Sequence, residues 1–218
     1  MTSARNRKSK YDTSSLATRE RIIDAAGELF CQDGYSGASI SKIAKSAGVL
    51  SGSLYWVFSS KEELFSEVLR AESENWGEKV VRNTAFPLGD IGDFANSLDV
   101  VGEELVNAPR FIRLILVVAS ERSANTEVTR NVVQKVRAFW RDRMERELLR
   151  FTDGFDRDRA EAFARRISRL TTQLIDGIVI SMQIEEQDAT VEEMLDQIKK
   201  TVTREIVHGL AELKAGAA

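Results

Sequence analysis

Helical periodicity runs through almost the whole chain. Apolar residues recur at three- and four-residue spacing, which places them on one face of a helix. No long stretch alternates between apolar and polar residues as a strand would. Only Pro87 and Pro109 interrupt the 218 residues, so long helices are permitted. Because 43% of the residues are hydrophobic, the chain can bury a core, and we expect an all-α fold of about nine helices.

Glycines and capping residues divide this pattern into segments. The first helix starts near residue 18 and stops at Gly34, a common residue at helix C-termini. Ser39 is the expected N-cap of a short second helix, and Gly48 ends that helix before a short third one. Ser60 and Glu63 form a capping box for the fourth. The remaining helices are expected to run from residue 61 into the low eighties, over residues 94–107, from residue 109, and over residues 127–151, 157–186 and 191–213.

Charge is distributed unevenly along the chain. Residues 1–61 contain nine Lys and Arg against five Asp and Glu, a net charge of +4, and the remainder carries −7. A basic N-terminal part on an acidic body suggests that one end meets a polyanion. Chance clustering of cations in residues 5–10 of a flexible arm explains the charge equally well. No apolar segment follows this arm, so it is not expected to be a secretory signal.

Several classes of protein are disfavoured by residues that the chain lacks. With one cysteine, Cys31, and one histidine, His208, neither a disulfide framework nor a Cys/His zinc site is expected. A single cysteine fits a reducing cytoplasm. No run of about eighteen apolar residues suggests a membrane span. Without a metal constellation or a phosphate-binding glycine loop, an enzyme built on a helical bundle is disfavoured, and we expect no cofactor.

The segment "VLSGSLYWVFSSKEEL" contains the second of two short helices joined by a glycine turn. Two short helices joined in this way are the pattern of a helix-turn-helix. Its outer positions combine small residues with aromatic ones. Gly52 lets a backbone approach DNA, and serine hydroxyls can bond to phosphates or bases. Tyr55 and Trp56 carry a polar tip on a flat apolar body, suited to a phosphate or a thymine methyl group. Lys61 lies at a helix start, where phosphate is favoured.

Residues 18–69 resemble the N-terminal domain of the tetracycline-repressor (TetR) family of transcriptional regulators. The resemblance is carried by "RERIIDAAGELFCQDGYSGASISKIAKSAGV" followed by "SGSLYWVFSSKEELFSEVL". It implies a homodimer that places its third helix in the major groove and binds a small molecule through its C-terminal body. We therefore expect a disordered basic arm (1–17), a helix-turn-helix DNA-binding domain of three helices (18–64), and a helical effector-binding and dimerisation domain (65–218).

The resemblance also implies which residues contact DNA. Alternatives remain, since Ser39 can serve only as a cap, Tyr55 can pack between the first and fourth helices, and Lys61 can belong only to the helix start. Leu50 stands where the family often has a capping Ser or Thr, so Ser51 can take that role one residue later. Trp56 stands where histidine or tyrosine is more usual. The candidate DNA contacts are Ser39, Lys42, Ser51, Gly52, Ser53, Tyr55, Trp56 and Lys61.

Few bidentate base contacts are available, because residues 51–56 include no arginine or glutamine. We therefore expect DNA shape, water or the basic arm to supply much of the specificity. The operator should be near-palindromic, because a two-fold dimer reads two half-sites.

The rest of the chain offers candidates for an effector site and a dimer interface. Aromatic residues at helical spacing usually form core, but a body rich in them can also line an apolar cavity. The candidate effector-binding residues are Trp76, Phe111, Arg113, Phe139 and Trp140. Apolar stripes on the last two helices suit either an intramolecular core or a four-helix dimer interface, and the resemblance favours the dimer. The candidate interface residues are Ile167, Leu170, Leu174, Gly177, Ile178, Leu195, Ile198, Val202 and Ile206.

These patterns favour a cytoplasmic, ligand-responsive DNA-binding regulator. Its expected partners are a double-stranded DNA operator, a small-molecule effector and a second copy of itself, without a membrane partner. That the regulator represses transcription, and does not activate it, is implied only by the resemblance. Two alternatives stay open: a small-molecule-binding helical dimer without specific DNA binding, and a helical-bundle enzyme.

Overall fold

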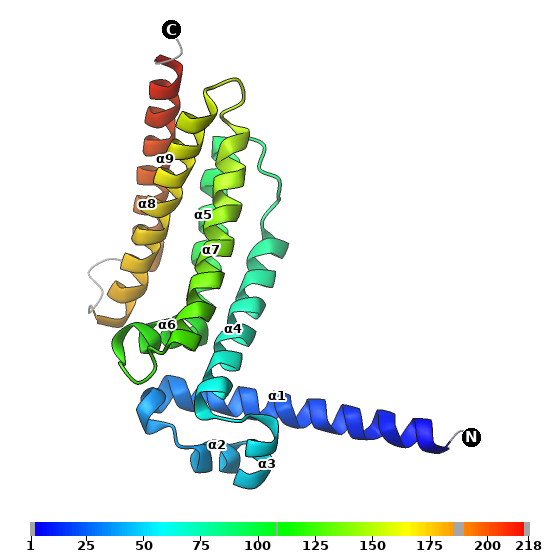
Figure 1. Cartoon of the computed structure of the whole chain (residues 1–218). Coiled ribbons are helices and arrows are strands. Elements are labelled where there is room, and N and C mark those ends of the chain that lie inside the picture. Colours follow the sequence, from blue (N-terminus) through cyan, green and yellow to red (C-terminus); the bar gives the residue numbers. More distant parts are fainter. Residues whose placement is uncertain (1–2, 108, 185–189, 216–218) are drawn as a thin grey trace. The chain divides into compact units, whose positions relative to one another are not determined.

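The computed structural model describes residues 3–107, 109–184 and 190–215, and the side chains of residues 16–107, 110–182 and 190–215. Within these ranges the protein has nine α-helices and no strand, which confirms the all-α prediction (Figure 1). None of the described helices is long and apolar enough to cross a membrane. The helices are α1 (Ser3–Gly37), α2 (Ile40–Ser46), α3 (Ser51–Val57), α4 (Lys61–Asn83), α5 (Ile91–Val106), α6 (Pro109–Ser120), α7 (Glu127–Arg150), α8 (Arg157–Ile184) and α9 (Val191–Ala215).

The chain divides into two compact units. The head unit comprises Met1–Glu74 and Arg110–Gln134, and the body unit comprises Asn75–Pro109 and Lys135–Ala218. This division differs from the expected boundary after residue 64. The difference arises because Leu114 and Val118 of α6 are buried in the same core as α1 and the start of α4. The head therefore contains a segment that lies far along the chain.

Helix α1 extends towards the N-terminus beyond the expected start near residue 18. In place of the expected disordered arm, residues 3–17 are helical. The physical reason is local, because no glycine or proline precedes Gly27 to stop the helix. Gly34 interrupts α1 with a φ of 70°, as its predicted role as a helix stop requires.

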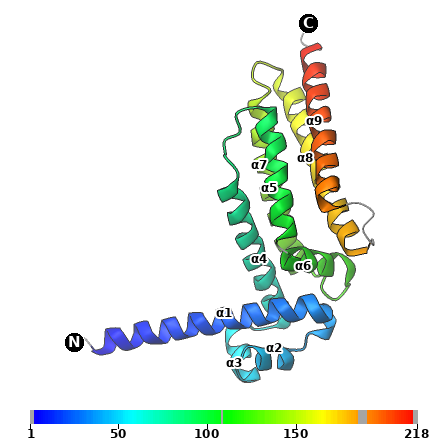
Figure 2. The same cartoon turned by 180° about the vertical axis from the view of Figure 1, so that it is seen from behind.

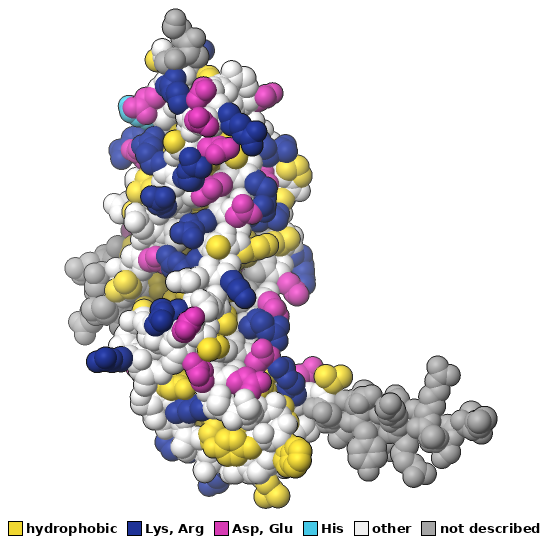
Figure 3. Space-filling view, in the orientation of Figure 1, with side chains coloured by type: hydrophobic (Ala, Val, Ile, Leu, Met, Phe, Trp, Pro, Cys, Tyr) yellow, Lys and Arg dark blue, Asp and Glu magenta, His cyan; other side chains and the backbone are white. Residues whose placement is uncertain are grey.

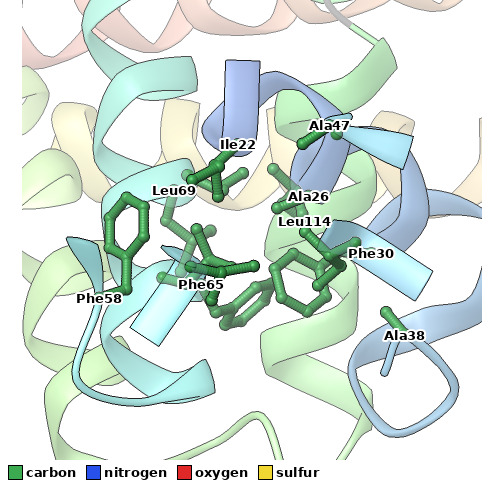
Figure 4. Close-up of a cluster of buried hydrophobic side chains, with 14 of the residues drawn as sticks. Ile22, Ala26, Phe30, Ala38, Ala47, Phe58, Phe65, Leu69 and Leu114 are labelled. Atoms are coloured by element: carbon green, nitrogen blue, oxygen red, sulfur yellow. The ribbon is translucent and has the colours of Figure 1, made fainter. Parts of the chain in front are cut away.

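The head core lies where α1, α2, α3, α4 and α6 meet (Figure 4). Ile22, Ala26 and Phe30 occur along one face of α1, and all three are fully buried. The Phe30 ring meets Phe65 of α4 edge-to-face, with centroids 4.7 Å apart. Burial of aromatic and aliphatic side chains is the main source of stability in such a core. It gives the two short helices a rigid support.

The body core lies along α9, which packs against both α5 and α8 (Figures 1 and 2). Close packing is allowed by glycine at two positions. A Cβ at Gly209 would lie 2.5 Å from the Phe163 ring, and one at Gly102 would overlap the Leu195 side chain. Gly177, a candidate interface residue, has no such packing role within the chain, because it is exposed and has open space around it.

Candidate nucleic-acid interface

Helices α2 and α3 form the predicted helix-turn-helix. Ser39 is the N-cap of α2, and its side-chain oxygen accepts a hydrogen bond from the backbone N–H of Lys42 at 3.2 Å, which confirms the capping prediction. The chain turns at Gly48, whose φ is 66°, a value that favours glycine. Ile43 and Ala44 bury the inner side of α2 in the head core.

The start of α3 differs from one expectation. Leu50 occupies the N-cap position, without a side-chain hydrogen bond, and Ser51 is already the first helical residue. The suggested shift of the cap to Ser51 is therefore not seen. A backbone hydrogen bond closes the first turn of α3, since the N–H of Leu54 donates to the Leu50 carbonyl at 3.2 Å. The Leu50 side chain is 78% exposed.

Helix α3 has one buried side and one open side. Leu54 is fully buried, as is Phe58 directly after the helix, and both hold α3 against the head core. Tyr55 is 55% exposed and Trp56 is 92% exposed, so Tyr55 does not pack between α1 and α4. A Cβ built at Gly52 would meet nothing within 4 Å. Figure 3 shows apolar side chains gathered over the end of the head that carries α3.

The start of α4 is capped by neighbouring residues. The backbone N–H of Glu63 donates to Ser60 Oγ at 3.0 Å, as the capping-box prediction requires. The returning bond goes to a different residue, because the Glu63 carboxylate accepts the N–H of Ser59 at 2.7 Å. Hydrogen bonds from Ser59 hold the pKa of Glu63 below its usual value. The cap orders the chain between α3 and α4.

Both candidate lysines already have partners within the chain. Lys61 Nζ lies 4.6 Å from the centre of the Tyr35 ring, and partial burial lowers the pKa of Lys61. Lys42 Nζ lies 3.0 Å from the Asp33 carboxylate, with both side chains partly exposed. An exposed pair of this kind contributes little free energy, so the Lys42 ammonium remains accessible to a phosphate.

A contact that no local sequence pattern indicates fixes the turn between α1 and α2. The Glu121 carboxylate, just after α6, accepts the backbone N–H of Tyr35 at 2.9 Å and that of Ser36 at 3.1 Å. The Ser36 and Ser123 hydroxyls lie 2.8 Å apart. A Cβ at Gly34 would overlap the carboxylate, so glycine is required there. We call these contacts the Glu121 clamp.

The start of α6 also contacts other helices of the head. The Arg110 guanidinium donates to Asp24 Oδ1 at 2.7 Å and lies 3.2 Å from the Glu72 carboxylate. The Arg110 carbonyl lies 3.6 Å from the Cys31 thiol. Burial raises the pKa of Cys31 to about 11, which fits a packing role for this residue. These contacts span helices far apart in sequence, and no local pattern reveals them.

The five candidate effector residues do not form one cluster. In the body unit, Trp76 and Trp140 meet edge-to-face with centroids 5.0 Å apart, and Phe139 contacts Trp140 at 5.3 Å. Phe139 is 51% exposed, whereas Trp76 is buried. Phe111 and Arg113 belong to the head unit, where Phe111 is buried and Arg113 is exposed. Only the three body residues stay together as a candidate site.

Most of the candidate dimer residues belong to the core of a single chain. The buried ones form the inner sides of α8 and α9 and pack in the body core of the single chain. Leu195 packs against Gly102 of α5. The sequence pattern did not distinguish the two possibilities, because an internal face and a dimer face are both apolar. The buried residues are Ile167, Ile178, Ile198, Val202 and Ile206.

An outer groove runs between α8 and α9 beside these core residues. It is lined by polar and charged side chains together with Leu170, and its lining includes Arg166, Gln173, Thr201 and Glu205. Leu170 and Leu174 are half-buried and Gly177 is exposed. These three candidates therefore remain accessible to a second chain.

A pair of short helices on an all-helical support, with one side of the second helix open to solvent, defines a helix-turn-helix DNA-binding domain. Comparison with known proteins agrees with this class. Residues 22–68 match the model of the bacterial regulatory proteins of the tetR family. The similarity to this family therefore covers the helix-turn-helix segment of the chain.

Individual relatives show how far this similarity extends. The chain is 44% identical over 72 residues to the HTH-type transcriptional regulator AcrR of Shigella flexneri, and this match covers 33% of each of the two chains. It is 50% identical over 52 residues to SrpR of Pseudomonas putida, or 24% of each chain. The matches thus span a third or less of these relatives. The fatty acid degradation regulator FadR of Bacillus halodurans has a similar fold, with a TM-score of 0.65 at 17% identity, over 85% of this chain and 94% of that one.

Proposed function

We propose that this protein is a sequence-specific DNA-binding transcriptional regulator that places α3 in the major groove. The observation that carries the proposal is the open side of α3. Tyr55, Trp56 and the space at Gly52 face solvent, while Leu54 and Phe58 fix the helix to the core. A core that holds one side of a helix rigidly and leaves the other free is what groove recognition requires.

The proposed DNA contacts follow from position. Small residues at the start of α3 allow close approach to base edges, and the aromatic pair lies one turn further along. Lys42 and Lys61 are proposed to meet phosphates, where each would add to the salt dependence of binding. Ser39 accepts the capping hydrogen bond, and its exposed hydroxyl is placed to donate a hydrogen bond to a phosphate. The full proposed set is Ser39, Lys42, Ser51, Gly52, Ser53, Tyr55, Trp56 and Lys61.

The regulation that we propose is release from a palindromic operator by a small molecule. Effector binding is proposed in the body unit beside Phe139 and Trp140, whose partly exposed rings lie next to the buried Trp76. Dimerisation is proposed through the outer faces of α8 and α9, with Leu170, Leu174 and Gly177 at the contact. A regulator that binds the chromosome acts in the cytoplasm, and the function needs neither catalysis nor a membrane.

Fluorescence anisotropy tests the proposal. The full chain is used to select duplexes from a random pool, and the enriched duplex is compared with a scrambled one across a salt series. We expect tight, salt-sensitive preference for the enriched duplex, and half-sites whose centres are about 34–36 Å apart or a multiple of that. No enrichment would support a binding protein without specific DNA recognition.

A double variant, Tyr55→Ala with Lys61→Ala, tests the site itself. It should weaken binding of the enriched duplex and leave the oligomeric state unchanged. The matched control is Val81→Ala with Lys200→Ala, which removes an exposed apolar residue and an exposed lysine from the body unit. Equal binding by both double variants would contradict the assignment of α3.

A further inference from the structure

The open side of α3 carries two aromatic side chains and a glycine. Gly52, Tyr55 and Trp56 stand at positions i, i+3 and i+4, which share a helix face. This face lies opposite Leu54 and Phe58, which are buried. Trp56 is 92% exposed, so its indole adds almost nothing to the stability of the head. Its exposed neighbours on α3 make it part of a group of apolar side chains, and such a group, unlike a single exposed residue, marks an interaction site.

The side chains on this face lack the groups that make paired hydrogen bonds to guanine or adenine. Recognition of guanine commonly uses arginine or lysine, and recognition of adenine uses asparagine or glutamine, each through paired hydrogen bonds. Residues 50–57, "LSGSLYWV", contain none of these. Indole offers a single N–H donor on a wide apolar body. Leu50, 78% exposed at the start of α3, offers only apolar surface.

Phosphate contacts have other sources close to α3. Lys45 lies exposed in the last turn of α2. The Arg21 guanidinium lies 3.9 Å from where a Cβ of Gly48 would stand, beside the turn that leads into α3. Lys61 begins α4 directly after α3. With these cations around the helix, Trp56 is not needed for the phosphate backbone and is free to meet the bases.

The apolar group that B-DNA offers in its major groove is the C5-methyl group of thymine. We propose that α3 reads thymine through this methyl group, with Trp56 as the specificity-determining side chain and Tyr55 beside it. Gly52 permits the approach that such a contact needs, because no side chain holds the helix away from the groove. This inference rests on the proposed function and adds the chemistry of the bases that the protein prefers.

Replacing thymine by deoxyuridine tests the proposal, because it removes only the methyl group and keeps the hydrogen-bonding edges of the base. The duplex enriched by the full chain is synthesised with each thymine of a half-site replaced in turn, and affinities are measured by fluorescence anisotropy. We expect about fourfold weaker binding for each contacted methyl group, the value for burying one such group. Trp56→Ala should bind the thymine and deoxyuridine duplexes equally. Val128→Ala, an exposed apolar residue elsewhere in the head, should keep the difference.

The outcomes separate this inference from the proposed function. Sequence preference that is insensitive to deoxyuridine, or an enriched duplex without thymine in its half-sites, would overturn the reading of thymine and leave the regulator intact. A difference that persists in Trp56→Ala would remove Trp56 as its cause. If no sequence is enriched at all, both the regulator and the reading of thymine are rejected.

Discussion

Replacing Glu121 by alanine should loosen the helix-turn-helix from its support. The Glu121 carboxylate accepts two backbone amides of the turn that leads to α2, at 2.9 and 3.1 Å. Hydrogen bonds to a charged acceptor contribute about 1.5–3 kcal/mol each. Ser36 is exposed, so water replaces part of the loss once the carboxylate is removed. We therefore expect the free energy of unfolding to fall by about 1–3 kcal/mol in total.

DNA binding should weaken in the same variant, because α2 and α3 follow directly from the clamped turn. If the whole loss enters the affinity, Kd rises about tenfold for each 1.4 kcal/mol. This effect opposes simple electrostatics, since removing a negative charge favours DNA binding. Glu28→Ala is the matched control, because it removes an exposed carboxylate of the same unit. It should bind DNA as tightly as the wild type or slightly more tightly.

Urea unfolding and fluorescence anisotropy measure the two effects. Gly34→Ala provides an independent route to the same clamp, since its φ of 70° is strained for alanine and the new Cβ would overlap the carboxylate. Both variants should lower stability and affinity together. If Glu121→Ala matched Glu28→Ala in both assays, the clamp would have no role in positioning α2 and α3.

Three further predictions concern other parts of the molecule. Ile206→Ala should lower the free energy of unfolding by about 2–5 kcal/mol, because Ile206 is fully buried within one chain; urea unfolding should give this loss at every protein concentration, whereas a loss that appears only at concentrations where two chains associate would indicate a subunit interface. Since burial raises the pKa of Cys31 to about 11, its alkylation by iodoacetamide at pH 8 should be about 200-fold slower than that of a free thiol; mass spectrometry follows the reaction, and a rate equal to that of glutathione would contradict the burial. Hydrogen bonds from Arg70 and Arg19 lower the pKa of Glu67, so its stabilisation is present above its unfolded pKa of about 4.3 and is lost as the pH falls through the lower folded value. Glu67→Gln should therefore destabilise the protein at pH 7 and reduce its acid sensitivity in urea unfolding, and an unchanged acid response would show that other carboxylates govern it.

Features that depend on local sequence were predictable. Helix caps at Ser39 and Ser60, the turn glycine Gly48 and the apolar face of α1 each follow from residues within a few positions of one another. The candidate DNA-contacting face of α3 was predictable for the same reason, because its buried and open sides follow from helical periodicity. The exception is the N-terminal arm, where the absence of helix breakers outweighed its polar composition.

Features that depend on contacts between distant segments were not predictable. Tyr35 and Glu121 are 86 positions apart, and nothing in either local sequence indicates the other. The assignment of α6 to the head has the same origin. The role of the apolar stripe through Val202 and Ile206 was not predictable for a different reason. Periodicity shows that a helix face is apolar, but it does not show whether the covering surface belongs to the same chain or to a partner.

The structure separates what stabilises the head from what the head is proposed to recognise. α3 has only seven residues, too few for a stable helix in isolation, so Leu54, Phe58 and the surrounding helices must hold it in place. Trp56 and Gly52 lie on the opposite side and contribute little to that support. Substitutions on the open side can therefore change the preferred DNA sequence at almost no cost in stability. Substitutions at Glu121 or Gly34 should instead lower stability and affinity without changing the preferred DNA sequence. They weaken the support of α3 and leave its base-reading side chains intact.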